Sequence, residues 1–366
     1  MYSQTEIDEA VAAGALSPEA ATALRNHIEQ QRHMPTPDEE QFRLITGFND
    51  IFVSIAAAIL LFAVGFVGQW IGERSGLAIE NGPSFLGSAM VAATSWSLAL
   101  FFTARRRMAL PSILLLLAFV GSVFAATGML IVQIVGSAAF EDSNAMVGAL
   151  VAGSGAIAAA AAWVHWKTFR VPITVAAGAA AVVALAAGLL FSALPNTPEA
   201  GKIILGFVLL LGIGTFLFAM WWDSSDRARL TRRSDVAFWL HLLAAPLIVH
   251  PVFSLLGLND GNATIAEGLV VILLYVVLGV TALAVDRRAL LVSALAYVLF
   301  ALNRLFEQLG TVELNVALTA LVIGSALLML SAFWHQARAL VVRPLPASLR
   351  ERLPLVDRSA IPQPAA

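Results

Sequence analysis

The sequence predicts an all-α fold, a polytopic transmembrane helix bundle of about ten spans with both the N-terminus and the C-terminus in the cytoplasm. Of the 366 residues, 59% are hydrophobic and only 13% are charged, whereas soluble domains average roughly 45–50% apolar and about 25% charged residues. Long apolar runs recur from residue 51 to residue 334, and each can cross a hydrocarbon core of about 30 Å. Because backbone polar groups in lipid must be bonded internally, these runs are expected to be helices.

Residues 1–48 are expected to form a cytoplasmic helical hairpin and an amphipathic lead-in helix. Gly14 interrupts the hairpin, and Ser17-Pro18-Glu19 offers a capping hydroxyl followed by proline at the first helical position. A second helix start, Thr36 to Glu39, has the spacing of a capping box. Two interpretations stay open for this segment, a cap packed on the bundle or a docking site for a protein partner.

The transmembrane bundle is predicted over residues 49–337. Its ten spans lie roughly at 51–71, 84–103, 110–135, 145–165, 171–194, 202–222, 236–256, 266–285, 289–309 and 312–334. All but three of the 22 lysines and arginines lie in the termini or in the loops that follow every second span. Because such loops stay in the cytoplasm, this alternation predicts a multi-pass protein with both termini in the cytoplasm. Only Lys167 and Lys202 are lysines, which suggests a GC-rich bacterial genome and hence the cytoplasmic (inner) membrane of a bacterium.

Residues 338–366 are predicted to be a cytoplasmic tail that contains proline and arginine. Its five prolines exclude a long helix, and its arginines are expected to lie against anionic lipid headgroups.

Two patterns concern the packing of the spans. Spans two to nine can be written as four hairpins that start about 60 residues apart, near Phe85, Met146, Ile203 and Ala266, which suggests a parallel internal repeat; two inverted halves of five spans are the alternative. Small residues follow each other every four positions in 148–160 and 176–188. They predict a tight pair between spans four and five.

Polar residues at membrane depth are the main candidates for a binding site. They lie in the predicted outer half of the spans: Gln69, Gln133, His250, Asn303, Arg304 and Glu307. Arg304 and Glu307 share a helix face, and Arg304 would anchor a polar or anionic ligand. The alternative is that Arg304 extends to the headgroups beside Glu307, while His250 bonds to a neighbouring helix.

The stretch FWLHLLAAPLIVHP contains His241 and His250, which are nine residues apart. They lie on opposite faces of a regular helix and about 13 Å apart along it, so they cannot share one metal ion. For His241 a helix-interface hydrogen bond is favoured over a haem shared with His165 or His335. We expect no metal and no cofactor, and the chain has no cysteine for a thiolate site.

Pro246 and Pro251 leave the carbonyls of Leu242 and Leu247 without their helical donors. Such breaks occur at hinges and binding sites of transporters, but also in membrane helices without these roles.

The segments GALSPEAATAL and RLITGFND, together with the ten-span layout, resemble predicted bacterial membrane proteins of unknown function. In that family a short N-terminal helical hairpin precedes a many-span bundle. The resemblance implies architecture and transfers no site residues.

The resulting functional hypothesis is a transporter-like or permease-like protein for a small polar or anionic solute. The alternatives are a non-transporting membrane scaffold that acts through the N-terminal hairpin and, less favoured, a membrane enzyme on lipid-linked substrates, since no acid/base or metal constellation is present. The expected partners are the lipid bilayer and a protein at the hairpin. Nucleic acid is not expected to bind.

Overall fold

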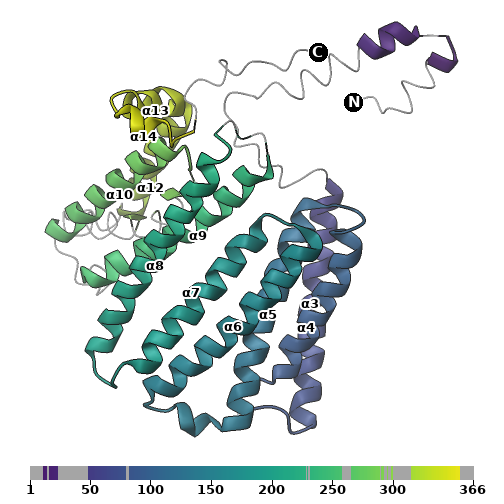
Figure 1. Cartoon of the computed structure of the whole chain (residues 1–366), viewed down its shortest axis with the longest axis vertical. Helices are drawn as coiled ribbons and strands as arrows, with labels where there is room; N and C mark the ends of the chain where they lie inside the picture. The colour runs from purple at the N-terminus through teal and green to yellow at the C-terminus, as the bar shows by residue number, and fades with distance from the viewer. Residues whose placement is uncertain are drawn as a thin grey trace. The chain divides into compact units, whose positions relative to one another are not determined.

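The structure is a computed structural model of the chain, and it describes residues 11–14, 16–23, 48–79, 82–227, 229, 231–257, 265–288, 290, 291, 295, 298, 299 and 315–354. The chain divides into two compact units, Met1–Phe42 and Arg43–Ala366. Within the described residues the regular elements are helices (Figure 1). The predicted all-α class is therefore confirmed.

The N-terminal unit contains the break and the cap that the sequence predicts. A short helical turn ends at Gly14, whose φ of +70° is readily adopted by glycine. The next helix begins after Ser17, and the Oγ of Ser17 accepts a hydrogen bond from the Ala20 amide at 3.1 Å. Residues 36–39 lie outside the described part, and the role of this unit stays a prediction.

The larger unit contains helices that are long and apolar enough to cross a membrane. Seven of the described helices meet this criterion, and they coincide with the first seven predicted spans. They are α3 (Phe48–Arg74), α4 (Phe85–Phe102), α5 (Ala109–Val135), α6 (Asn144–Phe169), α7 (Ile173–Ala193), α8 (Glu199–Ser224) and α9 (Arg232–Leu255).

The last three predicted spans are described only in part. The eighth is α10 (Ile265–Val285), and most of the ninth lies outside the described residues. The tenth, predicted over 312–334, corresponds to α12 (Asn315–Ala332), and after it the chain bends by 75° into a further helix, α13 (Trp334–Val342), which the sequence does not predict. The described part thus supports seven spans, or eight if the bent pair counts as one.

The helices α4 to α9 are arranged as three hairpins, each closed by a basic loop. The most extensive helix contacts are those of α6 with α7, of α8 with α9 and of α4 with α5. Each hairpin turns at a residue with positive φ, namely Arg107, Arg170 and Arg229, and Asp286 follows α10 in the same conformation. These turns recur at intervals close to 60 residues, the spacing that the sequence predicts between hairpins, and the parallel repeat and the two inverted halves both stay predictions.

The predicted tight pair between the fourth and fifth spans is confirmed in α6 and α7. A Cβ added to Gly155 would lie 2.6 Å from the Leu185 nitrogen, and one added to Gly188 would lie 2.5 Å from the Ala152 nitrogen. The backbones therefore touch where a side chain would keep them apart. The predicted four-residue stripe is wrong in its second half, because the buried face continues through Ala158 and Ala162, while Ala156 and Ala160 are exposed.

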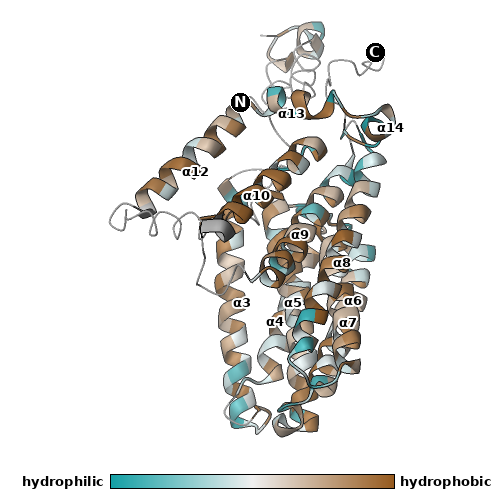
Figure 2. Ribbon diagram, turned by 90° about the vertical axis from the view of Figure 1, so that its left-hand side faces the viewer, coloured by the Kyte–Doolittle hydropathy of each residue, from teal (hydrophilic) through white to brown (hydrophobic). Residues whose placement is uncertain are grey.

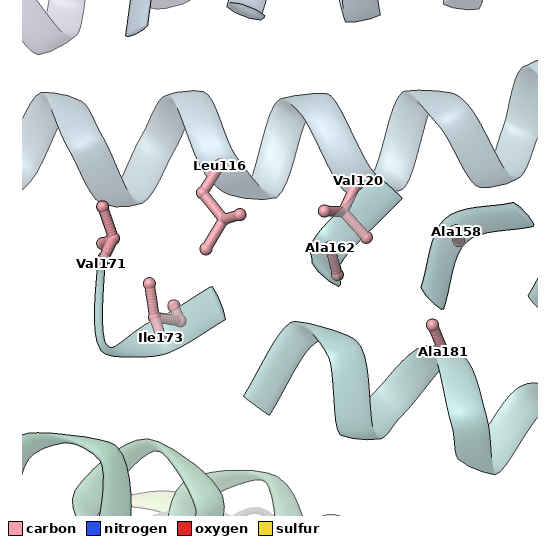
Figure 3. Close-up of a cluster of buried hydrophobic side chains, with 7 residues drawn as sticks. All are labelled: Leu116, Val120, Ala158, Ala162, Val171, Ile173 and Ala181. Atoms are coloured by element: carbon pink, nitrogen blue, oxygen red, sulfur yellow. The ribbon is translucent and has the colours of Figure 1, made fainter. Parts of the chain in front are cut away.

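The core of this unit is built from small and aliphatic side chains. Figure 3 shows one cluster in which Leu116 and Val120 of α5 meet Ala158 and Ala162 of α6 and Ala181 of α7. The outer surface is apolar as well, and hydrophobic colouring follows the lengths of the helices (Figure 2). Phe62 is 78% exposed and Ile134 75% exposed. Water would strongly disfavour such a surface, whereas lipid accommodates it.

Candidate functional site

Asp223 is a completely buried carboxylate near the end of α8, and two cationic or ionisable side chains converge on it. The Arg287 guanidinium, just beyond α10, donates from Nη2 to Oδ1 at 2.5 Å and from Nε to Oδ2 at 3.2 Å. Nε2 of His241, which lies in the first half of α9, is 3.1 Å from Oδ2. The side chains of Asp223 and His241 have no exposed surface, and that of Arg287 is 2% exposed. One carboxylate therefore joins the ends of three helices.

A second acid, Asp286, forms the adjoining half of this site. Arg229 donates from Nη1 to Asp286 Oδ2 at 3.0 Å and from Nη2 to the carbonyl of Val285 at 3.1 Å. The indole of Trp334 donates to Asp286 Oδ1 at 2.7 Å. Arg338 of α13 lies 3.7 Å from the same oxygen and donates to the Pro354 carbonyl at 2.7 Å. We call this set the charged cluster: Asp223, Arg229, His241, Asp286, Arg287 and Arg338.

The backbone explains why these groups meet. Arg229 and Asp286 both have positive φ, 56° and 60°, so the chain turns sharply at both residues, and the turn at Asp286 is followed by Arg287, which contacts Asp223. Arg287 also donates from Nη2 to the Ser234 carbonyl in the first turn of α9, at 3.0 Å. Beyond the α12–α13 bend, Trp334 and Arg338 of α13 both contact Asp286.

The energetics favour a cluster that is kept intact. Removing an ion from water costs several kcal/mol, and a buried pair offsets that cost only when its remaining donors and acceptors are also bonded. The two-bond contact between Arg287 and Asp223 is the stronger geometry of such pairs. Removing one member would leave the others charged and buried. The arrangement provides ionic contacts that join residues of α8, α9 and α13 to the segments that follow α8 and α10.

His241 has the role that the sequence favours for it, a hydrogen bond at a helix interface. Its partner Asp223 belongs to α8, and the ring of Phe216 packs against it with centroids 5.1 Å apart. The α8–α9 interface is also very close at a second point, since a Cβ on Gly212 would lie 2.8 Å from the Leu247 carbonyl carbon. Leu247 is one of the two residues whose carbonyl loses its donor to a proline.

His165 occupies a separate, aromatic environment between α6 and α7. Its Nδ1 is 3.2 Å from the Thr174 hydroxyl, and three rings surround it with centroids between 4.6 and 6.0 Å away: Trp96, Phe119 and Phe169. This geometry holds the α6–α7 hairpin closed near its turn.

The polar residues predicted for the outer half are placed as follows. His250 is exposed near the end of α9, and Pro246 and Pro251 are accommodated within that helix. Gln69 accepts a hydrogen bond from the Ser84 amide at 2.7 Å and donates to Glu73 at 2.8 Å, so it joins α3 to the start of α4. The side-chain oxygen of Gln133 in α5 is buried without a hydrogen-bond partner.

The remaining three of these residues, Asn303, Arg304 and Glu307, lie outside the described part of the chain. Their predicted contact with His250 stays a prediction.

The charged cluster is the main feature that sequence reasoning missed. Arg229 and Arg287 were assigned only a topological role, and Arg338 was expected to lie against headgroups. That expectation for Arg338 is wrong, because its side chain is 3% exposed and contacts Asp286. The available signal was an acid at the same end of two successive hairpins, Asp223 and Asp286, each a few residues from arginine.

Comparisons of the chain with protein-family models, with curated proteins and with solved structures give no match.

Proposed function

We propose that the chain is a multi-pass protein of a bacterial inner membrane that transports a small polar or anionic solute in the manner of a permease. The observation that carries the proposal is the charged cluster, which joins α8, α9, α10 and α13 at one end of an otherwise apolar bundle. Ionisable groups inside membrane bundles are costly and are the default candidates for function.

The charges themselves support a contact that opens and closes. Well-packed apolar side chains hold helix ends together at least as well as a buried ion pair, so stability alone does not account for five charged groups and a histidine. An ion-pair cluster can separate when water or a charged solute replaces its partners. We infer that it closes the cytoplasmic end of a solute path.

Helix α9 provides the mechanical element in this proposal. It carries His241 in its first half, Pro246 and Pro251 in its second half and His250 between them. A change of bend at the prolines would move His241 relative to Asp223 on α8, and the closely approaching Gly212 allows α8 to slide along it without a side chain in the way.

The solute is proposed to bind toward the opposite end of α9. The candidate residues are His250, Asn303, Arg304, Glu307, Gln133 and Gln69, with Arg304 as the anchor for an anionic group. The exposed position of His250 and the unpartnered oxygen of Gln133 support a polar layer at this depth.

The test is solute flux in proteoliposomes that contain the full chain, with a panel of labelled small organic anions and polar neutral solutes. We expect saturable uptake of at least one solute, reduced about tenfold or more by Arg304→Ala and His250→Ala, since each removes a hydrogen bond to charge. Lys202→Ala is the matched control, because Lys202 is an exposed cation in the first turn of α8, and it should leave flux unchanged. No uptake of any solute by folded wild-type protein would reject the proposal.

A membrane scaffold is the second candidate, and the division of the chain favours it. Met1–Phe42 forms a compact unit of its own, as expected of a docking element. A partner that crosslinks to the full chain, and that is lost when residues 1–42 are deleted, together with absent flux, would favour this function.

A further inference from the structure

An apolar groove lies between α10, the residues that follow it, and the α12–α13 bend. Leucines line most of it, among them Leu291 and Leu327, together with Tyr275. Arg288, Ser331 and Trp334 also line it and lie beside one another. The empty volume is about 460 Å³, part of which is open to the surroundings. The groove is thus amphipathic, with a mostly leucine lining and a cation beside the Ser331 hydroxyl.

Arg288 differs from the arginines of the charged cluster. Its neighbour Arg287 is paired with Asp223, whereas Arg288 forms no ion pair within the described residues. Its guanidinium carbon lies 4.9 Å from the centroid of the Trp334 ring, and its only hydrogen bond in that part of the structure is a long one of 3.5 Å to Ser331 Oγ. Most of its donors therefore stay available in the groove.

The position of Trp334 is fixed, so the cation is held in place. The indole nitrogen donates to Asp286 at 2.7 Å, and the ring is 3% exposed. A cation over a fixed aromatic face is stabilised without losing its charge. A partly buried cation that forms no ion pair with any of the described acids is complementary to an anionic group that enters the groove.

We propose that this groove binds an anionic phospholipid. Its phosphate would contact Arg288 and the Ser331 hydroxyl, and one acyl chain would lie along the leucines toward Tyr275. The ten residues from Tyr275 to Val285, the end of α10, span about 15 Å at 1.5 Å per residue, which is about half of a hydrocarbon core of about 30 Å. The site goes beyond the proposed transport and depends only on insertion into a membrane.

The apolar lining favours a phospholipid over a free phosphate. A soluble anion would gain the contacts to Arg288 and Ser331 but none along the leucines, whereas burial of an acyl chain adds about 0.8 kcal/mol for each methylene group removed from water. Arg288 also lies three residues beyond the end of α10, and basic side chains near the ends of membrane helices attract anionic headgroups.

The experiment is native mass spectrometry of the detergent-purified full chain, titrated separately with phosphatidylglycerol and with phosphatidylcholine of identical acyl chains. We expect the wild type to retain phosphatidylglycerol more strongly. Arg288→Gln should weaken its retention about tenfold, the loss of a charge-assisted hydrogen bond, and leave phosphatidylcholine unchanged. Arg343→Gln is the matched control, because Arg343 is an exposed arginine of the same end, and it should behave as the wild type.

Two further variants keep the test independent of folding. Arg288→Lys preserves the charge and should restore most of the preference for phosphatidylglycerol. Leu327→Trp fills the groove and should reduce the retention of both lipids. Inorganic phosphate should not displace bound phosphatidylglycerol. The proposal is overturned if Arg288→Gln retains phosphatidylglycerol as the wild type does, if Arg343→Gln weakens it equally, or if phosphate alone displaces it.

Discussion

The buried carboxylate of Asp223 holds several segments of the apolar bundle together. It has no exposed surface, and its two oxygens contact Arg287 and His241. Arg287 in turn donates to the Ser234 carbonyl, so the carboxylate links the end of α8 to both neighbouring helices. Its contribution comes less from the net energy of the pair than from the cost of leaving Arg287 and its neighbours charged, buried and uncompensated.

Replacing this carboxylate should therefore destabilise the protein strongly. We expect Asp223→Asn to lower the free energy of unfolding by about 3–5 kcal/mol, the range found when one partner of a buried ion pair is removed. Equilibrium unfolding in mixed detergent micelles, followed by tryptophan fluorescence, measures it.

Asp226→Asn is the matched control for that measurement. Asp226 lies in the α8–α9 loop and accepts hydrogen bonds from the amide and the hydroxyl of Thr231. It is less buried, and we expect a loss below about 1 kcal/mol. Equal losses for the two variants would show that Asp223 has no special role.

At the scale of elements, the helical hairpin is the unit that repeats. The three hairpins α4–α5, α6–α7 and α8–α9 have the most extensive helix contacts, and each turns through an arginine in the left-handed conformation. Different residues close each hairpin near its turn: His165 with Thr174 in one, and Asp223 with His241 in the next. The same hairpin backbone is therefore closed by different kinds of side chain. The α8–α9 hairpin, which carries charged groups, is the one we associate with function.

Glycine at the α6–α7 contact is expected to be essential for the closeness of that hairpin. Gly155→Ala places a Cβ 2.6 Å from the Leu185 nitrogen, and the backbones must separate to accommodate it. Overpacking of this kind costs about 1–3 kcal/mol, measurable by the same unfolding experiment.

The α8 helix offers the control. A Cβ on Gly206 meets no atom within 4 Å, so Gly206→Ala should be neutral or stabilise the protein by up to about 1 kcal/mol through helix propensity. A loss of stability in Gly206→Ala as large as that in Gly155→Ala would contradict this explanation.

At the scale of the whole molecule, the sequence predicts those parts of the fold that depend on the lengths of apolar segments and on local signals. The first seven spans, the α6–α7 pair and the capped N-terminal turn follow from runs of apolar residues, small residues and turn signals. The α12–α13 bend was not predictable in this way, and beyond it Trp334 and Arg338 contact Asp286, 48 residues earlier than Trp334. A hydropathy profile depends only on residues that are neighbours in the sequence, so it does not detect such contacts.

The candidate site was less predictable than the fold. His241 was identified as a residue at a helix interface, but nothing in its own segment indicates Asp223 as the partner. Arginines near helix ends satisfy the positive-inside rule whether they face water or the core, so sequence cannot distinguish the buried Arg287 from the half-buried Arg288. The distinction arises only when the turn at Asp286 sets their directions.

The proposed bundle spans the membrane with its charged cluster at the cytoplasmic end, and labelling of single cysteines can test this arrangement. The chain contains no cysteine, so Ser137→Cys and Ser224→Cys each introduce one exposed thiol, in the α5–α6 connection and at the last residue of α8. In intact cells a membrane-impermeant maleimide should label position 137 and leave position 224 unlabelled until the membrane is permeabilised. Labelling of position 224 in intact cells, with or without position 137, would show that the charged cluster does not lie at the cytoplasmic end.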